Sequence, residues 1–245
     1  MKTAKEIEQF YDGYVERQVN LGINPRHRSI QRWLKQFGLK PHHRVLEIGC
    51  GVGTQTELLL RYLGPQGFVT AMDISPRSIE VARQRLSSYK NAELIAADAT
   101  DYDFSEKYDM IVMPDVIEHI PVDLHYRLFE KLSAVLKDEG KIIIHIPNPY
   151  YLEWVHKNEP ELLQVIDQPI FTDILVKNVY PHGLYIHSLK TYDIWVEECD
   201  YQIIELRHYR PGLTYHRKPT PAWKSAVKFL ERVKLKLQLV LGLKK

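Results

Sequence analysis

The sequence is poor in cysteine and has no long apolar run. Its 245 residues include two cysteines, Cys50 and Cys199, too few for a disulfide framework or a zinc cluster. No stretch of about 18 apolar residues occurs and no apolar segment follows the first residues, which predicts neither a membrane span nor a signal peptide. Internal repeats and low-complexity segments are also lacking. These absences favour a protein of the reducing cytoplasm.

What is present fits a globular domain with an uneven charge distribution. The chain is 44% hydrophobic and 26% charged, which is ordinary for a domain with one sizeable core. The formal net charge is +2, yet residues 207–245 hold 11 Lys and Arg against one acid, Glu231. The body is therefore mildly acidic and the C-terminal end strongly basic, which predicts an anionic contact at that end.

Apolar runs of strand length alternate with helical patterns along the middle of the chain. We read strands at 44–48, 68–72, 92–96, 108–113, 141–146 and 201–207. Between them, Thr54, Ser75-Pro76 and Pro121 open helices. This alternation predicts an α/β fold, a doubly wound and mostly parallel sheet with helices on both faces. The carboxyl ends of the strands then share one edge, where ligands bind.

The regions outside these strands suggest how the chain is divided. Residues 1–40 show two amphipathic helical patterns and predict an N-terminal helical cap. Residues 41–210 form the core, in which the aromatic, proline-punctuated stretch 147–187 predicts a lid above the ligand edge. A helix is expected to follow this lid at 189–198. Residues 211–245 predict a basic amphipathic tail.

A buried strand runs directly into a glycine loop at residues 45–53, Val-Leu-Glu-Ile-Gly-Cys-Gly-Val-Gly. Glycine tolerates positive φ and lets a ligand approach the backbone, so three glycines at spacing two predict a loop pressed against a small molecule. A nicotinamide dinucleotide site would place its third glycine three residues after the second. The spacing here disfavours a nicotinamide-dependent dehydrogenase, which remains an alternative.

Acidic residues follow four consecutive strands, at Glu47, Asp73, Asp98 and Asp115. A carboxylate at the end of the second strand can accept hydrogen bonds from two ribose hydroxyls. Each acid alone has an ordinary explanation, because acids favour loops and helix caps. Four acids at successive strand ends indicate a nucleoside-binding edge.

The glycine loop and these acids resemble the motifs of the class I S-adenosylmethionine-dependent methyltransferases, over about residues 45–148. The resemblance implies a seven-stranded Rossmann-like sheet and S-adenosylmethionine as cofactor. It also implies that Asp73 binds the ribose hydroxyls with Ile74 against the adenine, and that Asp98 and Ala99 contact the adenine amino group. The remaining implied cofactor contacts are Glu47, Gly49, Gly51, Gly53 and Asp115.

The segment after the fourth strand carries the candidates for chemistry. Asp115, Glu118 and His119 match the acid-x-x-Glu-His pattern of the ubiquinone-biosynthesis O-methyltransferases, with Asp115 in place of the usual Glu. The resemblance implies either that His119 is a general base or that the three side chains hold Mg²⁺. By similarity to small-RNA 2′-O-methyltransferases, His187 or His182 would complete the metal site. Both interpretations remain open from sequence.

Aromatic residues predict how an acceptor would be enclosed. Tyr11 and Tyr14 resemble the aromatic lids of small-molecule methyltransferases. The 147–187 stretch adds Tyr150, Tyr151, Trp154 and His187. These side chains would bury a flat or apolar acceptor, although packing on the sheet explains them equally well.

Two neighbouring features have simpler interpretations. His145 on the fifth strand is read as a core or rim histidine rather than a catalyst. Asn148-Pro149 is read as a turn that ends the strand, since it matches only part of the Asn-Pro-Pro-Tyr motif of amino-directed methyltransferases.

We therefore expect a methyltransferase that acts on a small-molecule or glycan acceptor, at a hydroxyl oxygen. An N-methyltransferase acting on a small amine or amino sugar, and an inactive cofactor-binding partner subunit, remain alternatives. The tail suits a peripheral contact with the inner face of a membrane, or a docked helix in a homodimer. No recognisable RNA-binding module accompanies the basic residues, which disfavours nucleic acid as a partner.

Overall fold

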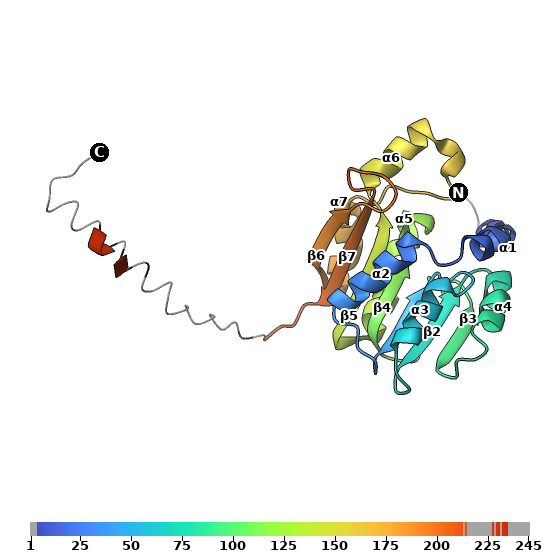
Figure 1. Cartoon of the computed structure of the whole chain (residues 1–245), viewed down its shortest axis with the longest axis horizontal. Coiled ribbons are helices and arrows are strands. Elements are labelled where there is room, and N and C mark those ends of the chain that lie inside the picture. The colour runs from blue at the N-terminus through green and yellow to red at the C-terminus, as the bar shows by residue number, and fades with distance from the viewer. Residues whose placement is uncertain (1–3, 213, 215–226, 228, 231, 235–245) are drawn as a thin grey trace. The chain divides into compact units, whose positions relative to one another are not determined.

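The computed structural model of the chain describes residues 4–212, 214, 227, 229, 230 and 232–234. It divides into two units, Met1–Tyr209 and Arg210–Lys245. The first unit contains a seven-stranded sheet in the order β3-β2-β1-β4-β5-β7-β6 (Figure 1). The strands are β1 Arg44–Ile48, β2 Phe68–Asp73, β3 Ala92–Ala96, β4 Tyr108–Pro114, β5 Leu136–Pro147, β6 Leu184–Tyr192 and β7 Tyr201–His208. The expected doubly wound α/β fold is confirmed.

The sheet is parallel except at one side. Strands β1 to β5 pair in parallel, and β7 runs antiparallel to both β5 and β6. The helices are α1 Ala4–Leu21, α2 Pro25–Gln36, α3 Thr54–Tyr62, α4 Pro76–Arg85, α5 Val122–Val135, α6 Pro149–Asn158 and α7 Thr172–Val179. Short 3₁₀ turns span Ile117–His119, Pro160–Leu162 and Tyr180–His182.

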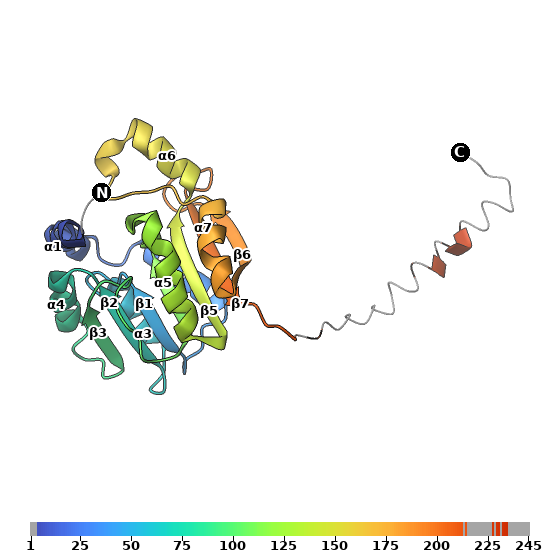
Figure 2. The same cartoon turned by 180° about the vertical axis from the view of Figure 1, so that it is seen from behind.

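Both faces of the sheet are buried, which explains the continuous apolar runs of the central strands. Successive side chains of β1 point to opposite faces, so Val45 joins one apolar cluster and Leu46 the other. The cluster around Val45 includes residues of α2, α3 and α4. The cluster around Leu46 includes residues of α5 and α7, the helices in front of the sheet in Figure 2. Helices therefore cover both faces.

Three expectations about the elements were wrong. Residues 189–192 continue β6 instead of opening a helix over 189–198, because β6 pairs along its length with β7. Helix α2 is part of the core, since Ile30 and Leu34 are fully buried against the sheet. Helix α7 lies within the expected lid stretch, yet Leu175 and Val179 pack into the core.

Capping side chains fix where α2 and α4 begin. Asn24 caps α2 by accepting a hydrogen bond from the His27 amide at 3.3 Å, and Pro25 follows as the first helical residue. Ser75 caps α4 in the same way, by accepting from the Ser78 amide at 3.0 Å. These starts place the first turn of α2 at the carboxyl edge of the sheet.

The basic tail expected at 211–245 lies mostly outside the described residues. Where the second unit is described, residues 227, 229, 230 and 232–234 are helical and their side chains are exposed. Among the described residues, no helix is long and apolar enough to cross a membrane. The expected membrane or homodimer contact through this tail stays a prediction.

Candidate functional site

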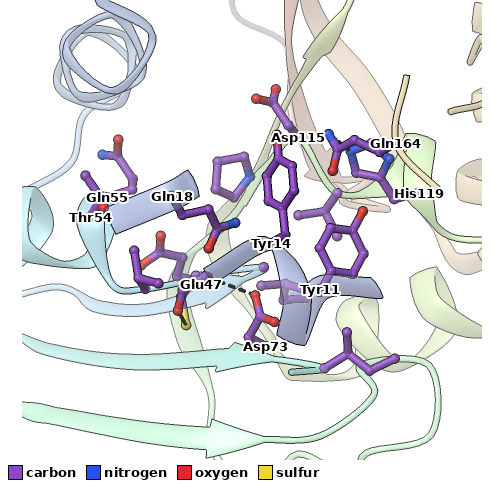
Figure 3. A pocket seen from close by; sticks show the side chains of 18 of the residues that line it. Tyr11, Tyr14, Gln18, Glu47, Thr54, Gln55, Asp73, Asp115, His119 and Gln164 are labelled. Atoms are coloured by element: carbon purple, nitrogen blue, oxygen red, sulfur yellow. Dashed lines mark hydrogen bonds between the residues drawn. The ribbon is translucent and has the colours of Figure 1, made fainter. Parts of the chain in front are cut away.

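A cavity of about 750 Å³ lies at the carboxyl edge of the sheet, where the sequence placed the ligand site. Its wall combines the ends of β1, β2 and β4 with residues of α1 and the first turn of α2. Figure 3 shows these side chains converging from several elements. The predicted cofactor residues that line it are Glu47, Gly49, Gly51, Asp73, Ile74, Asp98, Ala99 and Asp115.

The first two glycines of the loop have positive φ and leave no room for a side chain. Gly49 has φ of 76°, and a Cβ on it would stand 2.3 Å from Cγ2 of Val116. Gly51 has φ of 52°, and its Cβ would meet Oε1 of Gln18 at 2.8 Å. Both positions therefore require glycine and expose loop backbone to the cavity.

The third glycine has a different role from the one expected. Gly53 does not line the cavity. It precedes α3 with φ of 77°, and a Cβ on it would lie 3.1 Å from Leu86 and 3.2 Å from Ala82 of the α4 region. Gly53 therefore allows α3 and α4 to approach one another and lies outside the cavity wall.

Asp73 organises the loop as well as facing the cavity. Its Oδ2 accepts a hydrogen bond from the Gly51 amide at 2.8 Å, and its Oδ1 accepts from the Ser75 amide at 2.9 Å. Burial raises the pKa of this carboxyl, while the two amide bonds oppose that rise. Each oxygen keeps a second lone pair, which is what a vicinal diol requires.

Two other predicted acids differ in their surroundings. Oδ1 of Asp98 accepts from the amide and the hydroxyl of Thr100, both at 2.8 Å, so one face of this carboxylate closes a turn. Glu47 is fully buried at the end of β1, and burial raises its pKa to about 7. A nearby cationic group on a ligand would favour the charged form of Glu47.

Helix α1 forms one wall of the cavity. Tyr11, Tyr14 and Gln18 line the cavity from one side of this helix, as Figure 3 shows. The Tyr11 hydroxyl is buried and has no hydrogen-bond partner among the described residues. An unpartnered buried hydroxyl is uncommon in a folded protein and indicates a place for a ligand or water.

A group of hydrogen bonds and one ion pair, called the latch below, joins Asp12 and Glu16 of α1 to Ser75 and Arg77 at the start of α4. Oδ1 of Asp12 accepts from the Ser75 hydroxyl at 2.5 Å and from the Arg77 amide at 3.3 Å. Arg77 also donates to the Asp12 carbonyl at 3.2 Å and pairs with Glu16 at 3.2 Å. These bonds hold the tyrosines of α1 over the pocket.

His119 lines the cavity with both ring nitrogens engaged. Its Nδ1 lies 2.5 Å from the Ile166 carbonyl and 3.2 Å from Oδ1 of Asp167. Because both neighbours are oxygens, Nδ1 carries the proton of the neutral ring. Nε2 is then the lone-pair nitrogen, and the side-chain amide of Gln164 donates to it at 3.2 Å. This arrangement suits a base that receives a proton at Nε2.

Glu118 is buried behind His119 and does not line the cavity. Its carboxylate has no hydrogen bond within the described part of the chain, and Nε2 of His119 lies 3.9 Å from Oε1. Burial raises the pKa of Glu118 to about 7, against the effect of His119. The expected catalytic role of Glu118 therefore lacks a direct route to a substrate.

The expected metal site is not assembled. Asp115 pairs with Arg26 and with Nδ1 of His145, so its carboxylate is already used. His187 is exposed on β6, where its Nδ1 lies 3.4 Å from the Tyr185 hydroxyl, and His182 packs against Tyr126. Among the described residues, no three His, Cys, Asp or Glu side chains are grouped to hold a metal ion. Glu118 and His119 are neighbours, whereas Asp115 is paired with Arg26 and His145, and His187 is exposed on β6.

The expected lid residues of the 147–187 stretch do not line the cavity. Tyr150 is 70% exposed and Trp154 48% exposed on α6, and Tyr151 stacks on Trp154. The stretch contributes Leu162 and Gln164 instead, through the turn that follows α6. Of the aromatic residues expected in the lid, Tyr11 and Tyr14 line the cavity and the three α6 residues do not.

Comparison with known proteins agrees with this geometry. Residues 45–140 match the family model described as a methyltransferase domain. The malonyl-[acyl-carrier protein] O-methyltransferase 1 of Ilyobacter polytropus is 30% identical over 54% of this chain and 46% of its own length. The demethylmenaquinone methyltransferase of Staphylococcus aureus is 27% identical over 46% of each chain. The chain thus spans about half the length of the curated relatives it matches.

A solved structure extends the likeness to the whole fold. The magnesium protoporphyrin IX methyltransferase of Synechocystis, solved with bound S-adenosylhomocysteine, superposes with a TM-score of 0.67 at 18% identity. The match covers 84% of this chain and 99% of that one. Residues 45–140 thus match a methyltransferase domain, and the chain shares its Rossmann-like fold with this solved methyltransferase. The resemblance stated from the sequence is confirmed.

Several residues of the site gave no signal in the sequence. Asp167 and Gln164 lie in a proline-punctuated stretch nearly fifty residues after His119, and no motif joins them to it. Arg26 was one of several basic residues in an amphipathic helix pattern. Only the path of the chain brings Arg26 and Gln164 to the cavity and Asp167 to His119.

Proposed function

We propose that this protein binds S-adenosylmethionine and transfers its methyl group to a hydroxyl oxygen of a small-molecule or glycan acceptor. The observation that carries the proposal is the contact of His119 with Asp167 and Ile166 at the cavity wall. That contact makes Nε2, which accepts a hydrogen bond from the Gln164 side chain, the nitrogen that can take up a proton. A second support is the cofactor half of the cavity, in which Asp73 and the glycine loop fit a nucleoside.

Bound S-adenosylmethionine would supply an electrophilic methyl carbon on a sulfonium, whose carbon–sulfur bond breaks as the acceptor oxygen attacks. The chain's own residues do the rest. Asp73 holds the ribose, and Gly49 and Gly51 give the ligand access to the loop backbone. His119 takes the acceptor's proton at Nε2, and Asp167 stabilises the resulting imidazolium.

The shape of the acceptor side suggests what the acceptor looks like. Leu162 and Trp195 are each about half exposed and line the cavity. Deeper in, the wall includes Ile120, Pro121 and Leu124, with His119 and Gln164 as the polar groups. Such a wall suits an acceptor with an apolar or flat body and a single reacting polar group. Oxygen as the methylated atom is also supported by the name of the Ilyobacter relative, an O-methyltransferase.

Calorimetry with S-adenosylmethionine and S-adenosylhomocysteine tests the cofactor half of the proposal. Binding of both is expected, and absence of both refutes it. Transfer of a labelled methyl group into small-molecule and glycan fractions tests the acceptor half. Label recovered on oxygen supports the proposal, label on nitrogen assigns the rival activity, and binding without transfer to any fraction favours an inactive subunit.

A further inference from the structure

A buried chain of hydrogen bonds connects the sheet to the cavity at Asp115. Nδ1 of His145 lies 2.9 Å from Oδ1 of Asp115, and Nε2 lies 2.7 Å from the Tyr192 hydroxyl. The Ser29 hydroxyl donates to the Tyr192 oxygen at 3.0 Å. The chain of contacts ends at Arg26, whose guanidinium donates to Oδ2 of Asp115.

The donors and acceptors in this chain leave one consistent arrangement. Tyr192 accepts from Ser29, so its own hydroxyl proton is available to Nε2 of His145. Nε2 is then an acceptor, and Nδ1 donates its proton to Asp115. The ring is fully buried and stacks on Tyr201 at 4.7 Å, and burial lowers the pKa of His145 well below its usual value. His145 is therefore held as one neutral tautomer.

Both the backbone and the side chain of Asp115 are held by hydrogen bonds. Its amide donates to the His145 carbonyl at 2.7 Å, and its φ is 55°, a left-handed value that aspartate tolerates better than most residues. Asp115 thus contacts His145 through main chain and side chain together. Any turn of the carboxylate would break its contacts with Arg26 and His145.

Arg26 is the residue at the cavity wall that this hydrogen-bonded arrangement holds in place. It occupies the first turn of α2, lines the cavity and is about a quarter exposed. The residue after Asp115 is Val116, which packs directly over Gly49 of the loop. The guanidinium therefore contacts the residue just before Val116, which lies against the glycine loop that, on the proposed function, receives the amino-acid end of the cofactor.

We infer that Tyr192 and His145 are positioning residues that hold Asp115, and through it hold Arg26 as the cation facing a ligand carboxylate beside the glycine loop. This inference rests on the proposed function, because the carboxylate in question is that of the cofactor's amino-acid group. Arg26 has five N–H donors in a planar fork, and a fixed fork loses less entropy when it binds a carboxylate. The buried chain of hydrogen bonds from Ser29 through Tyr192 and His145 to Asp115, called the relay below, holds the Arg26 guanidinium in place.

Calorimetry with two ligands tests the inference. S-adenosylhomocysteine carries the amino-acid group, and 5′-methylthioadenosine lacks it. Arg26→Ala is expected to weaken S-adenosylhomocysteine about tenfold or more, and Tyr192→Phe about threefold to tenfold. Neither change should alter the affinity for 5′-methylthioadenosine. Ser29→Ala, a milder change at the far end of the relay, should shift the ratio of the two affinities in the same direction.

Matched controls lie on the same strand. Tyr185→Phe and His187→Asn alter β6 outside the relay and should leave both affinities unchanged. Equal weakening of both ligands by Tyr192→Phe would show a merely structural role and overturn the inference. So would an unchanged affinity for S-adenosylhomocysteine in Arg26→Ala. A wild-type protein that bound neither ligand would overturn the proposed function, and the inference with it.

Discussion

Nδ1 of His119 lies 3.2 Å from Oδ1 of Asp167, and this contact orients the ring at the cavity wall. Asp167 is itself fixed. Its Oδ2 accepts from the backbone amide of Gln164, and its backbone carbonyl accepts from Nε2 of His156 at 2.6 Å. The segment is tied to the turn that bears His119, since the Gln168 amide donates to the Glu118 carbonyl at 3.0 Å. His119, on a short 3₁₀ turn, is thereby held by a second segment.

Replacing His119 by Ala should reduce methyl transfer to a hydroxyl acceptor by about 10²- to 10⁴-fold, because proton removal is lost. Binding of S-adenosylhomocysteine should change little, since His119 lies on the acceptor side. Asp167→Asn should lower the turnover number by a smaller factor, because the ring remains but its orientation and the stabilisation of its charged form are weakened. Steady-state kinetics and calorimetry measure these effects.

The control for Asp167→Asn is Asp173→Asn, an exposed aspartate that pairs with Lys177 on α7. It should keep full activity. If His119→Ala retained most of the turnover, the base assignment would be wrong. A loss of activity upon chelation by EDTA, restored by Mg²⁺, would instead favour the metal interpretation that the ligand geometry disfavours.

The loop glycines should separate into a ligand-facing pair and a structural one. Gly53→Ala should lower the free energy of unfolding by about 1–3 kcal/mol, because of the positive φ and the tight contact with Ala82 and Leu86. Its affinity for S-adenosylhomocysteine should stay close to that of wild type. Gly49→Ala should lose binding outright, because its Cβ would collide with Val116 beside the ligand. Similar binding defects in both variants would contradict this division.

Stability should depend on pH through Glu118. The folded protein holds the pKa of this carboxyl at about 7, above its usual 4.5. The stability that the neutral carboxyl provides is therefore complete below pH of about 4.5 and lost as pH rises through about 7. Glu118→Gln removes this dependence, so it should gain on the order of 3 kcal/mol relative to wild type between pH 5 and pH 8.

Chemical unfolding at several pH values measures this difference. Glu161→Gln, an exposed change in the turn after α6, is the control and should follow the wild-type profile. Glu47, whose pKa is also raised to about 7, contributes the same dependence in both proteins and cancels from the comparison. Parallel profiles for wild type and Glu118→Gln would show that the carboxyl is not held neutral by burial.

The latch between α1 and α4 should govern ligand release. Asp12→Ala removes the contacts with Ser75 and Arg77, so α1 should open more often and S-adenosylhomocysteine should dissociate several-fold faster. Stopped-flow displacement measures the dissociation rate. Gln9→Ala changes an exposed position of the same helix and should leave the rate unaltered. An unchanged rate in Asp12→Ala would mean that release does not require α1 to open.

Most of the sheet was predictable because its signals are local. The strands β1, β2 and β3 were placed within a residue of their observed ends, since each is a short apolar run bounded by turn residues. The error at 189–198 arose where the pattern was ambiguous. Residues of β6 are mostly exposed or partly buried without a regular alternation, and only the antiparallel partner β7 decides that they form a strand.

The cofactor half of the site was also largely predictable. The loop glycines and Asp73 belong to two short segments that follow neighbouring parallel strands, so the fold alone brings them together. Gly53 was the exception. The sequence shows that three glycines are present, but it does not show which of them face the cavity and which faces α4.

The sequence by itself determined the α/β sheet, the ligand edge and the residues that form its nucleoside end, because these follow from periodicity and from residues adjacent in the chain. Only the tertiary structure decided which side chains complete the other end. Asp167 reaches His119, Tyr192 reaches His145, and Arg26 reaches Asp115 across 89 positions of the chain. Such contacts depend on how loops return to the sheet, and no local pattern specifies that path.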